Sequence, residues 1–579
     1  TATNAVAVQS RSTNKIVNRA WAIAVASDAT CSDPGNCGGD GGDKTAVGAS
    51  IAVNVVLDQN KAEVGEGASI SAGSAVNVEA EDLSPNNAIF TLDAGDDGTT
   101  SEDFINANYT ATLQNSSYYA EAIAGGVAQG GNAGSGSLAL TISSGSTKAI
   151  VGEGVAISGA SANIRAFNES DARHLVGALA VADKKAIGAS ISGIYLKEDV
   201  MTVIGDNGSS DGGLTTTITT SAGDVDIVAA AEQDSITFMA AGGVSSNDLA
   251  LAGAFGFNVM DTDVEARIIE DVVINASAGA IGINANSDSN IRNFALAVAG
   301  SGGANSVGGS LAVNLFLTDK KAIVGSSAAT DNNIQLNASG AINVGVNAAQ
   351  DLVNGVISAS VSTSSNALSG ALSSNVIKGD SYALVQQGAD INQNLSINNS
   401  STSQSVGVTA RDQSNITDLT GTLAASSNAS IGVALGANVL WKDVQAGINS
   451  NVIADTNVVV TADTVQNLTA TVVGISASTG GLAGAGSISV GLVKSTTNAT
   501  IGGSADINTD GSMQLHAGDD TDIFMLEPAA SFSSGGMALA GAVGAAVFSG
   551  QTRARVLDNA VVTARGNTAM QVETDATQT

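Results

Sequence analysis

Residues 307–318 read VGGSLAVNLFLT, and they are followed by KAIVG at 321–325 and AINVGV at 341–346. The same three-part pattern occurs earlier as VGASIAVNVVLD at 47–58, with KAEVG and AVNVEA after it. It returns late in the chain as GAGSISVGLV at 484–493, with NATIG and MQLHA after it. A pattern copied at a long, regular spacing indicates a stacked repeat architecture rather than one globular core.

The repeat predicts a single continuous array over residues 1–579. The recurring Ile/Val-Gly pair ends at Gly65 in the first clear copy and at Gly502 in the last. The 437 residues between them cover seven intervals, or about 62 residues per unit, and the whole chain holds about nine units. Weaker copies fill the intervals at 134–166, 186–229, 251–285, 368–410, 431–462 and 539–572.

Each unit alternates with period two, which is typical of β-strands. Examples are SLAVNLFL at 310–317 and NVVVT at 457–461. We expect the β-branched residues to point inward, with Ala, Ser, Thr or Asn between them. Clusters of Gly, Asn, Asp and Ser, such as 206–213 and 326–333, supply the positive-φ positions of sharp corners. No long segment has a helical period, so the chain is predicted to be all-β.

The composition favours an elongated parallel β-solenoid, or β-helix, with a narrow interior. Only 3% of the residues are aromatic, prolines number three, and 68 glycines dilute the aliphatic residues. A propeller needs bulky blade residues and a β-sandwich array needs a repeated aromatic core, whereas Trp21 and Trp441 do not occupy matching positions of the repeat. A 62-residue unit is expected to contain two to three coils, which predicts a rod on the order of 100 Å long.

The charge balance argues against nucleic-acid and membrane-spanning functions. The 54 acidic residues outnumber 22 basic ones, for a net charge of −32, so a sustained basic patch for phosphate contacts cannot form. The longest apolar stretch, 537–548, is shorter than the roughly 20 residues that a membrane helix needs. These properties are typical of an exported extracellular chain.

The segment 49–80, with its ASIAVN, AEVG, ASISAG and VNVEA elements, resembles the repeat arrays of large exported bacterial adhesins of the filamentous-haemagglutinin and leukotoxin-like type. Related elements recur at 148–166 and 321–346. The resemblance implies a secreted β-solenoid stalk at the cell surface, acting in attachment, biofilm matrix or contact between cells. The partners that it implies are a host or neighbouring-cell receptor or a polysaccharide.

Two stretches interrupt the repeat. The first, 28–43, contains Cys31 and Cys37 around a turn sequence, which predicts a local disulfide in an oxidising compartment. The second, 81–118, is acidic. Because hard oxygen ligands in flexible Asp/Gly loops suit Ca²⁺, we considered a calcium site there, with a solvated acidic loop as the alternative. The candidate ligands are Asp93, Asp96 and Asp97.

Catalytic motifs are weak, and the chain is predicted not to be an enzyme. The string GSSDG at 208–212 matches a nucleophile elbow but lies in a turn-rich segment with no helix pattern after it. A β-helix polysaccharide-degrading enzyme is the alternative, but the bases cluster only at 184–185 and 320–321. Both lysine pairs are expected to be edge charges at matching turns of the repeat.

The predicted function is the non-catalytic stalk of a surface adhesin, and the alternative is a subunit of an extracellular filament or sheath. Residues 4–8 and 570–574 resemble interior strands of the repeat. Unpaired strands template further strands, so we expect self-association end to end or continuation into further repeats of the same chain.

Overall fold

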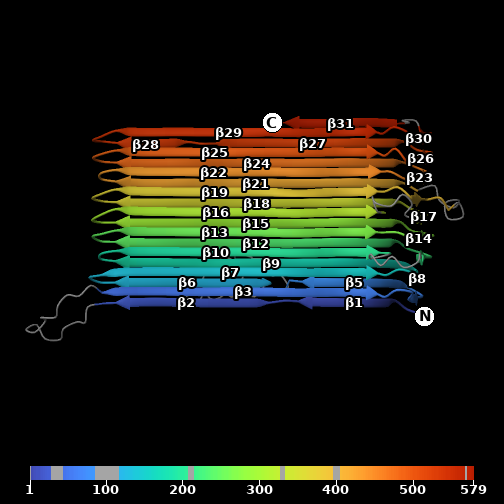
Figure 1. Ribbon diagram of the computed structural model, residues 1–579, viewed down its shortest axis with the longest axis horizontal. Coiled ribbons are helices and arrows are strands. Elements are labelled where there is room, and N and C mark those ends of the chain that lie inside the picture. Colours follow the sequence, from blue (N-terminus) through green and yellow to red (C-terminus); the bar gives the residue numbers. More distant parts are fainter. Residues whose placement is uncertain are drawn as a thin grey trace, which may run out of the picture.

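The computed structural model describes residues 2–27, 44–84, 116–205, 214–325, 333–394, 404–566 and 570–578. Within these ranges the regular structure consists of parallel β-strands arranged in three sheets (Figure 1). The chain winds repeatedly through the three sheets, so each sheet contains one strand from nearly every coil. The prediction of an all-β parallel solenoid is confirmed.

Sheet 1 has 13 strands, because some of its strand lines are broken into two pieces. Its members are β1 (Val6–Thr13), β2 (Ile16–Ala26), β5 (Ala75–Leu83), β6 (Tyr118–Ala128), β9 (Ser161–Ala182), β12 (Val225–Ser245), β15 (Ile281–Ser301), β18 (Ile342–Ser362), β21 (Val406–Ser426), β24 (Val458–Ser478), β27 (Met513–Leu526), β28 (Ala529–Ser533) and β31 (Met570–Gln578).

Sheets 2 and 3 have nine strands each, which confirms about nine units. Sheet 2 is long and consists of β3 (Thr45–Val64), β7 (Asn132–Val151), β10 (Ala186–Ile204), β13 (Ala250–Ile268), β16 (Ser306–Val324), β19 (Ala367–Val385), β22 (Ser430–Ile448), β25 (Ala483–Ile501) and β29 (Ala538–Val556). Sheet 3 is short and consists of β4 (Ser69–Ser71), β8 (Ala156–Gly159), β11 (Thr216–Thr220), β14 (Val272–Ala276), β17 (Ile334–Ala338), β20 (Ala389–Ile391), β23 (Asn451–Ala454), β26 (Asp506–Thr509) and β30 (Val561–Ala564).

One repeat makes one coil, so the expectation of two to three coils per unit was wrong. Ile281 at the start of β15 pairs with Ile342 at the start of β18, one repeat later. The strands are unusually long, with 21 residues in β15, 19 in β16 and 5 in β17, and the connections between them take up the rest of the 61-residue unit. At about 4.8 Å per strand, nine coils stack to roughly 40 Å rather than a rod of about 100 Å. The longest dimension therefore lies along the strands (Figure 1).

Glycine closes the corner between sheet 2 and sheet 3. Gly205 follows β10 with φ 99°, and Gly325 follows β16 with φ 91°. Such angles are unfavourable for residues that carry a Cβ. In the first two coils the positive φ lies two residues after the Val-Gly pair, at Gly67 and Gly154. At the opposite edge, short polar turns such as 302–305 connect sheet 1 to sheet 2.

The acidic insertion interrupts a single strand line of sheet 1. β5 and β6 both pair with β9, with Asp82 opposite Asn168 and Tyr118 opposite Ala172. Residues 81–83 and Tyr118 therefore belong to strands, and the insertion between the strands is 84–117 rather than 81–118.

The interior changes character across the width of the slab. Next to sheet 3, Val and Ile side chains from all three sheets fill a core that includes Ile283, Val324 and Leu336. Toward the polar turns, the buried residues are mostly Ala, Gly and Ser. There the facing backbones almost touch, since a Cβ added to Gly308 would lie 2.6 Å from the carbonyl oxygen of Ala359. We call this part of the slab, from the turns to the level of Asn314, the thin half.

The thin half reverses the predicted orientation of the side chains. In 310–317 the buried residues are Ser310, Ala312, Asn314 and Phe316, whereas Val313 is exposed. The expectation of inward β-branched residues was therefore wrong here, because two closely spaced sheets leave room only for small side chains. It is correct at 457–461, beside sheet 3, where Val458 and Val460 are buried.

The reversal gives the outer face of sheet 2 two parallel rows across its nine strands. The first, the apolar ridge, is Ile51, Leu138, Ile191, Phe255, Leu311, Leu372, Leu435, Ile488 and Val543. The second, the glycine groove, lies two residues nearer the turns and has glycine on six of the nine strands, with Ala49, Ala189 and Val433 on the other three. Its glycines are Gly136, Gly253, Gly309, Gly370, Gly486 and Gly541.

Candidate functional site

The residues singled out from the sequence as sites lie outside the described ranges. This applies to Cys31 and Cys37, to the calcium candidates Asp93, Asp96 and Asp97, and to the GSSDG string at 208–212. The disulfide and the calcium site stay predictions. Among the described residues, no group of three or more His, Cys, Asp or Glu side chains has an arrangement that could hold a metal ion.

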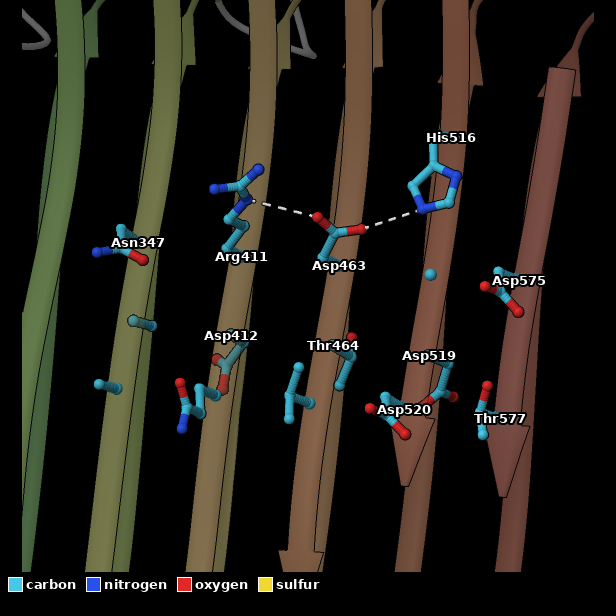
Figure 2. A pocket seen from close by; sticks show the side chains of 15 residues that line it. Asn347, Arg411, Asp412, Asp463, Thr464, His516, Asp519, Asp520, Asp575 and Thr577 are labelled. Carbon is cyan, nitrogen blue, oxygen red and sulfur yellow. Dashed lines mark ion pairs between the residues drawn. The ribbon is translucent and has the colours of Figure 1, made fainter. Parts of the chain in front are cut away.

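The outer face of sheet 1 has a hollow of about 570 Å³ near its last strands (Figure 2). Arg411 on β21 stands beside Asp463 on β24, with Nε and Oδ2 3.4 Å apart, and His516 on β27 approaches the other oxygen at 3.4 Å. Gly518 lies opposite Asp463 on the next strand and leaves space. Asp520, Asp575 and Thr577 complete the polar lining.

This hollow offers hydrogen-bond acceptors but little catalytic chemistry. Its ion pair between Arg411 and Asp463 is partly exposed, and such a pair contributes only about 0–1 kcal/mol. Arg411 and His516 both engage one carboxylate in a row along the stack, rather than converging with a nucleophile on one point. The arrangement suits transient contact with hydroxyl-rich or cationic groups.

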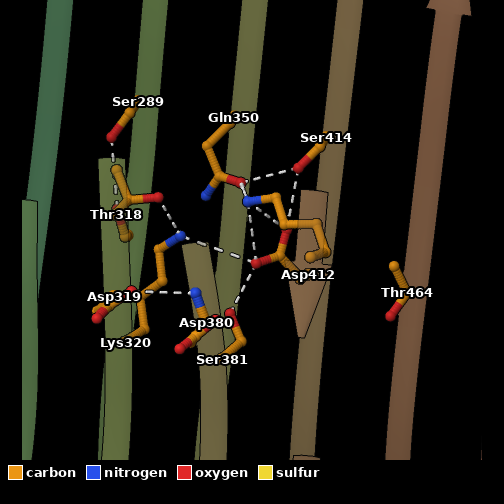
Figure 3. Close-up of polar contacts among 12 residues, drawn as sticks. Ser289, Thr318, Asp319, Lys320, Gln350, Asp380, Ser381, Asp412, Ser414 and Thr464 are labelled. Carbon is orange, nitrogen blue, oxygen red and sulfur yellow. Dashed lines mark hydrogen bonds and ion pairs between the residues drawn. The ribbon is translucent and has the colours of Figure 1, made fainter. Parts of the chain in front are cut away.

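A buried ionic cluster crosses the slab between sheets 1 and 2 (Figure 3). Asp412 on β21 lies between Lys442 on β22 and Lys320 on β16, with N–O distances of 3.2 Å to Oδ1 and 3.8 Å to Oδ2 respectively. All three side chains are fully buried. Ser381 and Ser414 donate to the carboxylate at 2.7 and 3.0 Å, respectively.

Hydrogen bonds to neutral side chains hold the two ammonium groups in place. Lys320 Nζ donates to Thr318 Oγ1 at 2.6 Å, and Lys442 Nζ donates to the amide oxygen of Gln350. Burial, reinforced by the nearby Lys442 charge, lowers the pKa of Lys320 to about 7. Burial alone would raise the pKa of Asp412, but the two lysines and Ser381 bring it below its usual value.

The interpretation of Lys320 as an edge charge at a turn was wrong. Lys320 lies within β16, whereas Lys184 and Lys185 lie in the turn between β9 and β10, so the two pairs do not occupy matching positions. The sequence did contain a signal that Lys320 is buried. Lys320 has the same parity as Phe316 and Ala322, and strand alternation sends all three to the interior.

A second buried group, near the first coils, is acidic. Glu198 on β10 accepts hydrogen bonds from Asn168 at 3.2 Å and Ser170 at 3.3 Å. Burial raises the pKa of Glu198 to about 8, with a further contribution from the charge of Asp82. Burial, together with the neighbouring Asp58, raises the pKa of Asp82 to about 7.

An asparagine ladder forms a third polar feature, in the middle of the slab. Asn258, Asn314, Asn375 and Asn438 occupy equivalent positions of successive strands in sheet 2, and their side-chain amides are linked at 2.8–3.1 Å. Toward the first coils, fully buried His174 continues the polar layer through Thr141 and Ser192, both at 2.7 Å. Burial lowers the pKa of His174 to about 3, so the ring is neutral at physiological pH.

Comparison with family models, with curated protein sequences and with solved structures gave no match to this chain. Among the described residues, no helix is long and apolar enough to cross a membrane. The fold and its polar clusters define the chain as a parallel β-solenoid with one repeat per coil.

Proposed function

We propose that the chain is a non-catalytic scaffold, the stalk of an extracellular surface adhesin. The observation that carries this proposal is the unbroken register of sheet 2, in which each strand from β3 to β29 pairs with the next over almost its full length. Bending or pulling apart two coils would break a long row of backbone hydrogen bonds together. Such a stack holds a binding segment at a fixed distance from a surface.

The placement of the ionisable groups supports a structural role. Lys320, Asp412, Lys442 and His174 have side chains of types that enzymes use in acid–base chemistry, and all four are buried between the sheets. Each is hydrogen-bonded or ion-paired within the slab, where it links coils or facing sheets. These contacts make the groups part of the framework. The net charge of −32 suits a solvated extracellular scaffold.

Attachment itself is assigned to the two interruptions of the repeat, because binding residues concentrate in loops presented by rigid scaffolds. The partner would be a cell-surface receptor or a polysaccharide. The second candidate function, a filament or sheath subunit, is favoured by a different observation. β3 and β29 each pair on one side only, and an open strand edge accepts a further strand from the same chain or from another molecule.

The sharpest test is an excision that respects the coil. Because Ile281 and Ile342 are register equivalents, deleting residues 281–341 removes one whole coil and rejoins the chain in phase. The deleted protein should keep its β-sheet circular dichroism and its attachment to cells, while the stack shortens by about 4.8 Å. Deleting 281–311 removes half a coil and should prevent folding. Lost attachment in the folded whole-coil deletion would contradict a stalk.

A second excision separates the adhesin from the filament. Removing residues 85–116 leaves Ser84 and Ser117 to occupy the two positions opposite Ser170 and Asp171, which restores one continuous strand. An adhesin should lose attachment and keep its assembly state. A filament subunit should keep both its attachment to cells and its assembly state. Turnover of a polysaccharide that disappears with this segment would replace the scaffold proposal with an enzymatic one.

A further inference from the structure

The outer face of sheet 2 is apolar across the thin half on successive strands. Exposed members include Leu372, Ile431, Val490 and Val543, with 39%, 40%, 44% and 58% of their surfaces accessible. The residues beneath them are small, so this half of the slab has its larger apolar side chains outside. Monomeric proteins rarely expose apolar patches beyond a few hundred Å².

The area of the face is large enough for a stable partner. Nine strands at about 4.8 Å and about ten residues of each strand at 3.3 Å give roughly 1,400 Å². A stable interface needs about 800 Å² from each partner. The face therefore exceeds the requirement without the rest of the slab.

The shape of the face is self-complementary. The apolar ridge presents a large side chain on every strand of sheet 2, and the glycine groove runs parallel to it, two residues away. A Cβ added at Gly136, Gly309, Gly370 or Gly541 would meet nothing within 4 Å, so packing inside the chain does not require glycine there. Two strands interrupt the groove: Val433 occupies it on β22, and the Phe255 ring lies over Gly253 on β13. On the other strands the ridge lies beside small residues and fits a second copy of the same surface.

The charges select one orientation of that second copy. Farther along the strands, the same face presents an aspartate row on successive strands of sheet 2, formed by Asp199, Asp263, Asp319, Asp380 and Asp443. A two-fold axis along the strands would stack the two aspartate rows against each other. A two-fold axis that runs in the stacking direction, between the ridge and the groove, instead makes the strands of the two copies antiparallel to each other. Each ridge then enters the partner's groove, and the acidic halves extend in opposite directions.

We propose that two copies of this chain pack face to face through sheet 2, with the apolar ridge of each in the glycine groove of the other. This inference does not rest on the proposed function, because it concerns the sides of the stack rather than its ends or its loops. The opposite face, on sheet 1, is also apolar in the thin half, but large and small residues are mixed along its rows. One row across five successive strands consists of Gly177, Ala240, Leu296, Ile357 and Gly421. It offers no continuous ridge.

The groove can be filled without disturbing the fold. Gly309→Leu with Gly370→Leu adds side chains into open space and blocks the partner's ridge. Sedimentation velocity across a concentration series should show the wild type as a dimer and the filled variant with a dissociation constant raised about tenfold or more. Thr496→Leu, at an outward position of sheet 2 beside the aspartate row, is the matched control and should leave dimerisation unchanged.

A compensating exchange makes the test specific. The axis places each coil opposite its own copy, so adding Leu311→Gly and Leu372→Gly to the filled variant swaps ridge and groove on both partners and should restore the dimer. A wild type that remains monomeric at 100 μM would overturn the proposal, as would a dimer that the filled variant leaves intact. Binding of monomers to phosphatidylcholine vesicles, with no dimer in solution, would assign the face to lipid and overturn it as well.

Discussion

Lys442 on sheet 2 and Asp412 on sheet 1 face each other across the interior, with Nζ and Oδ1 3.2 Å apart and neither side chain accessible to solvent. The pair ties the two long sheets together where the slab widens toward sheet 3. Because Lys320 shares the same carboxylate, the cluster has two amino groups for one carboxylate. Its stability therefore depends on Asp412 more than on either lysine.

Replacing Asp412 with Asn should destabilise the protein strongly. The substitution leaves two buried lysines without a counter-ion, and breaking a buried pair in this way costs about 3–5 kcal/mol. Urea unfolding followed by circular dichroism measures the change. Asp463→Asn, which removes a partly exposed pair with Arg411, should cost less than about 1 kcal/mol. Equal effects of the two substitutions would contradict the buried geometry.

The same cluster shows what the sequence could predict. Strand parity places Lys320 inside, yet parity alone cannot pair it with Asp412, which lies 92 residues later in the chain on another sheet. That pairing depends on the length of a coil. The repeat period of about 62 residues was readable from Gly65 and Gly502, but the number of coils per repeat was not. Strands of about 20 residues and strands of five to six give the same alternation, and only the positions of the turns distinguish them.

The sequence pattern also could not predict which side chains of the thin half point inward. In 310–317 both parities contain apolar residues, so alternation leaves two choices. Hydrophobicity alone favours burying Leu311 and Val313. Ala312 and Asn314 are buried instead, because the closely spaced sheets leave room only for small side chains. Sheet spacing is a property of the assembled coil and has no local signal.

Glu198→Gln should change the dependence of stability on pH. The folded pKa of Glu198, about 8, lies above the ordinary value of 4.5, so the folded state binds more protons than the unfolded state between these values. The contribution of Glu198 to stability is fully present below about pH 4.5 and falls as the pH rises to about 8. The variant should reduce this fall by an amount on the order of a few kcal/mol.

Urea midpoints at pH 5 and pH 7 measure this effect of Glu198. Asp82, with a pKa raised to about 7, acts in the same direction, so the double variant Asp82→Asn/Glu198→Gln should flatten the profile further. Glu573→Gln on the exposed strand β31 is the control and should leave the profile unchanged. A wild type that gains stability between pH 5 and pH 7 would contradict the prediction.

Lys320→Met should act in a separate range of pH. The folded pKa of Lys320, about 7, lies below its ordinary 10.5, so the unfolded state binds the extra proton between these values. The contribution of neutral Lys320 to stability is fully present above about pH 10.5 and is lost as the pH falls to about 7. Between pH 7 and pH 9 the wild type should therefore gain stability relative to the variant. The difference between their unfolding free energies at the two pH values tests the sign.

Asn314→Leu should destabilise the centre of the slab by about 3 kcal/mol. Asn314 accepts hydrogen bonds from Asn258 and Asn293 and donates to Asn354 and Asn375, all between 2.8 and 3.1 Å. The substitution leaves several buried amide groups without a partner, each at a cost of about 1–3 kcal/mol. Asn467→Leu, on the outer face of β24 with a ladder bond to Asn415, should cost less than about 1 kcal/mol in the same denaturation experiment.

Adjacent glycines give the most direct test of which way the thin half faces. Gly308 points inward, and a Cβ there would lie 2.6 Å from the Ala359 carbonyl oxygen, whereas a Cβ on Gly309 would meet nothing within 4 Å. Gly308→Ala must push two backbones apart and should cost about 1–3 kcal/mol. Gly309→Ala should be neutral or slightly stabilising, because alanine restricts the unfolded chain more than glycine does. Thermal melts of the two single variants compare them under identical conditions. If Gly309→Ala proved the more destabilising of the two, the large apolar residues of this half would have to point inward, and the outer face of sheet 2 would carry neither ridge nor groove.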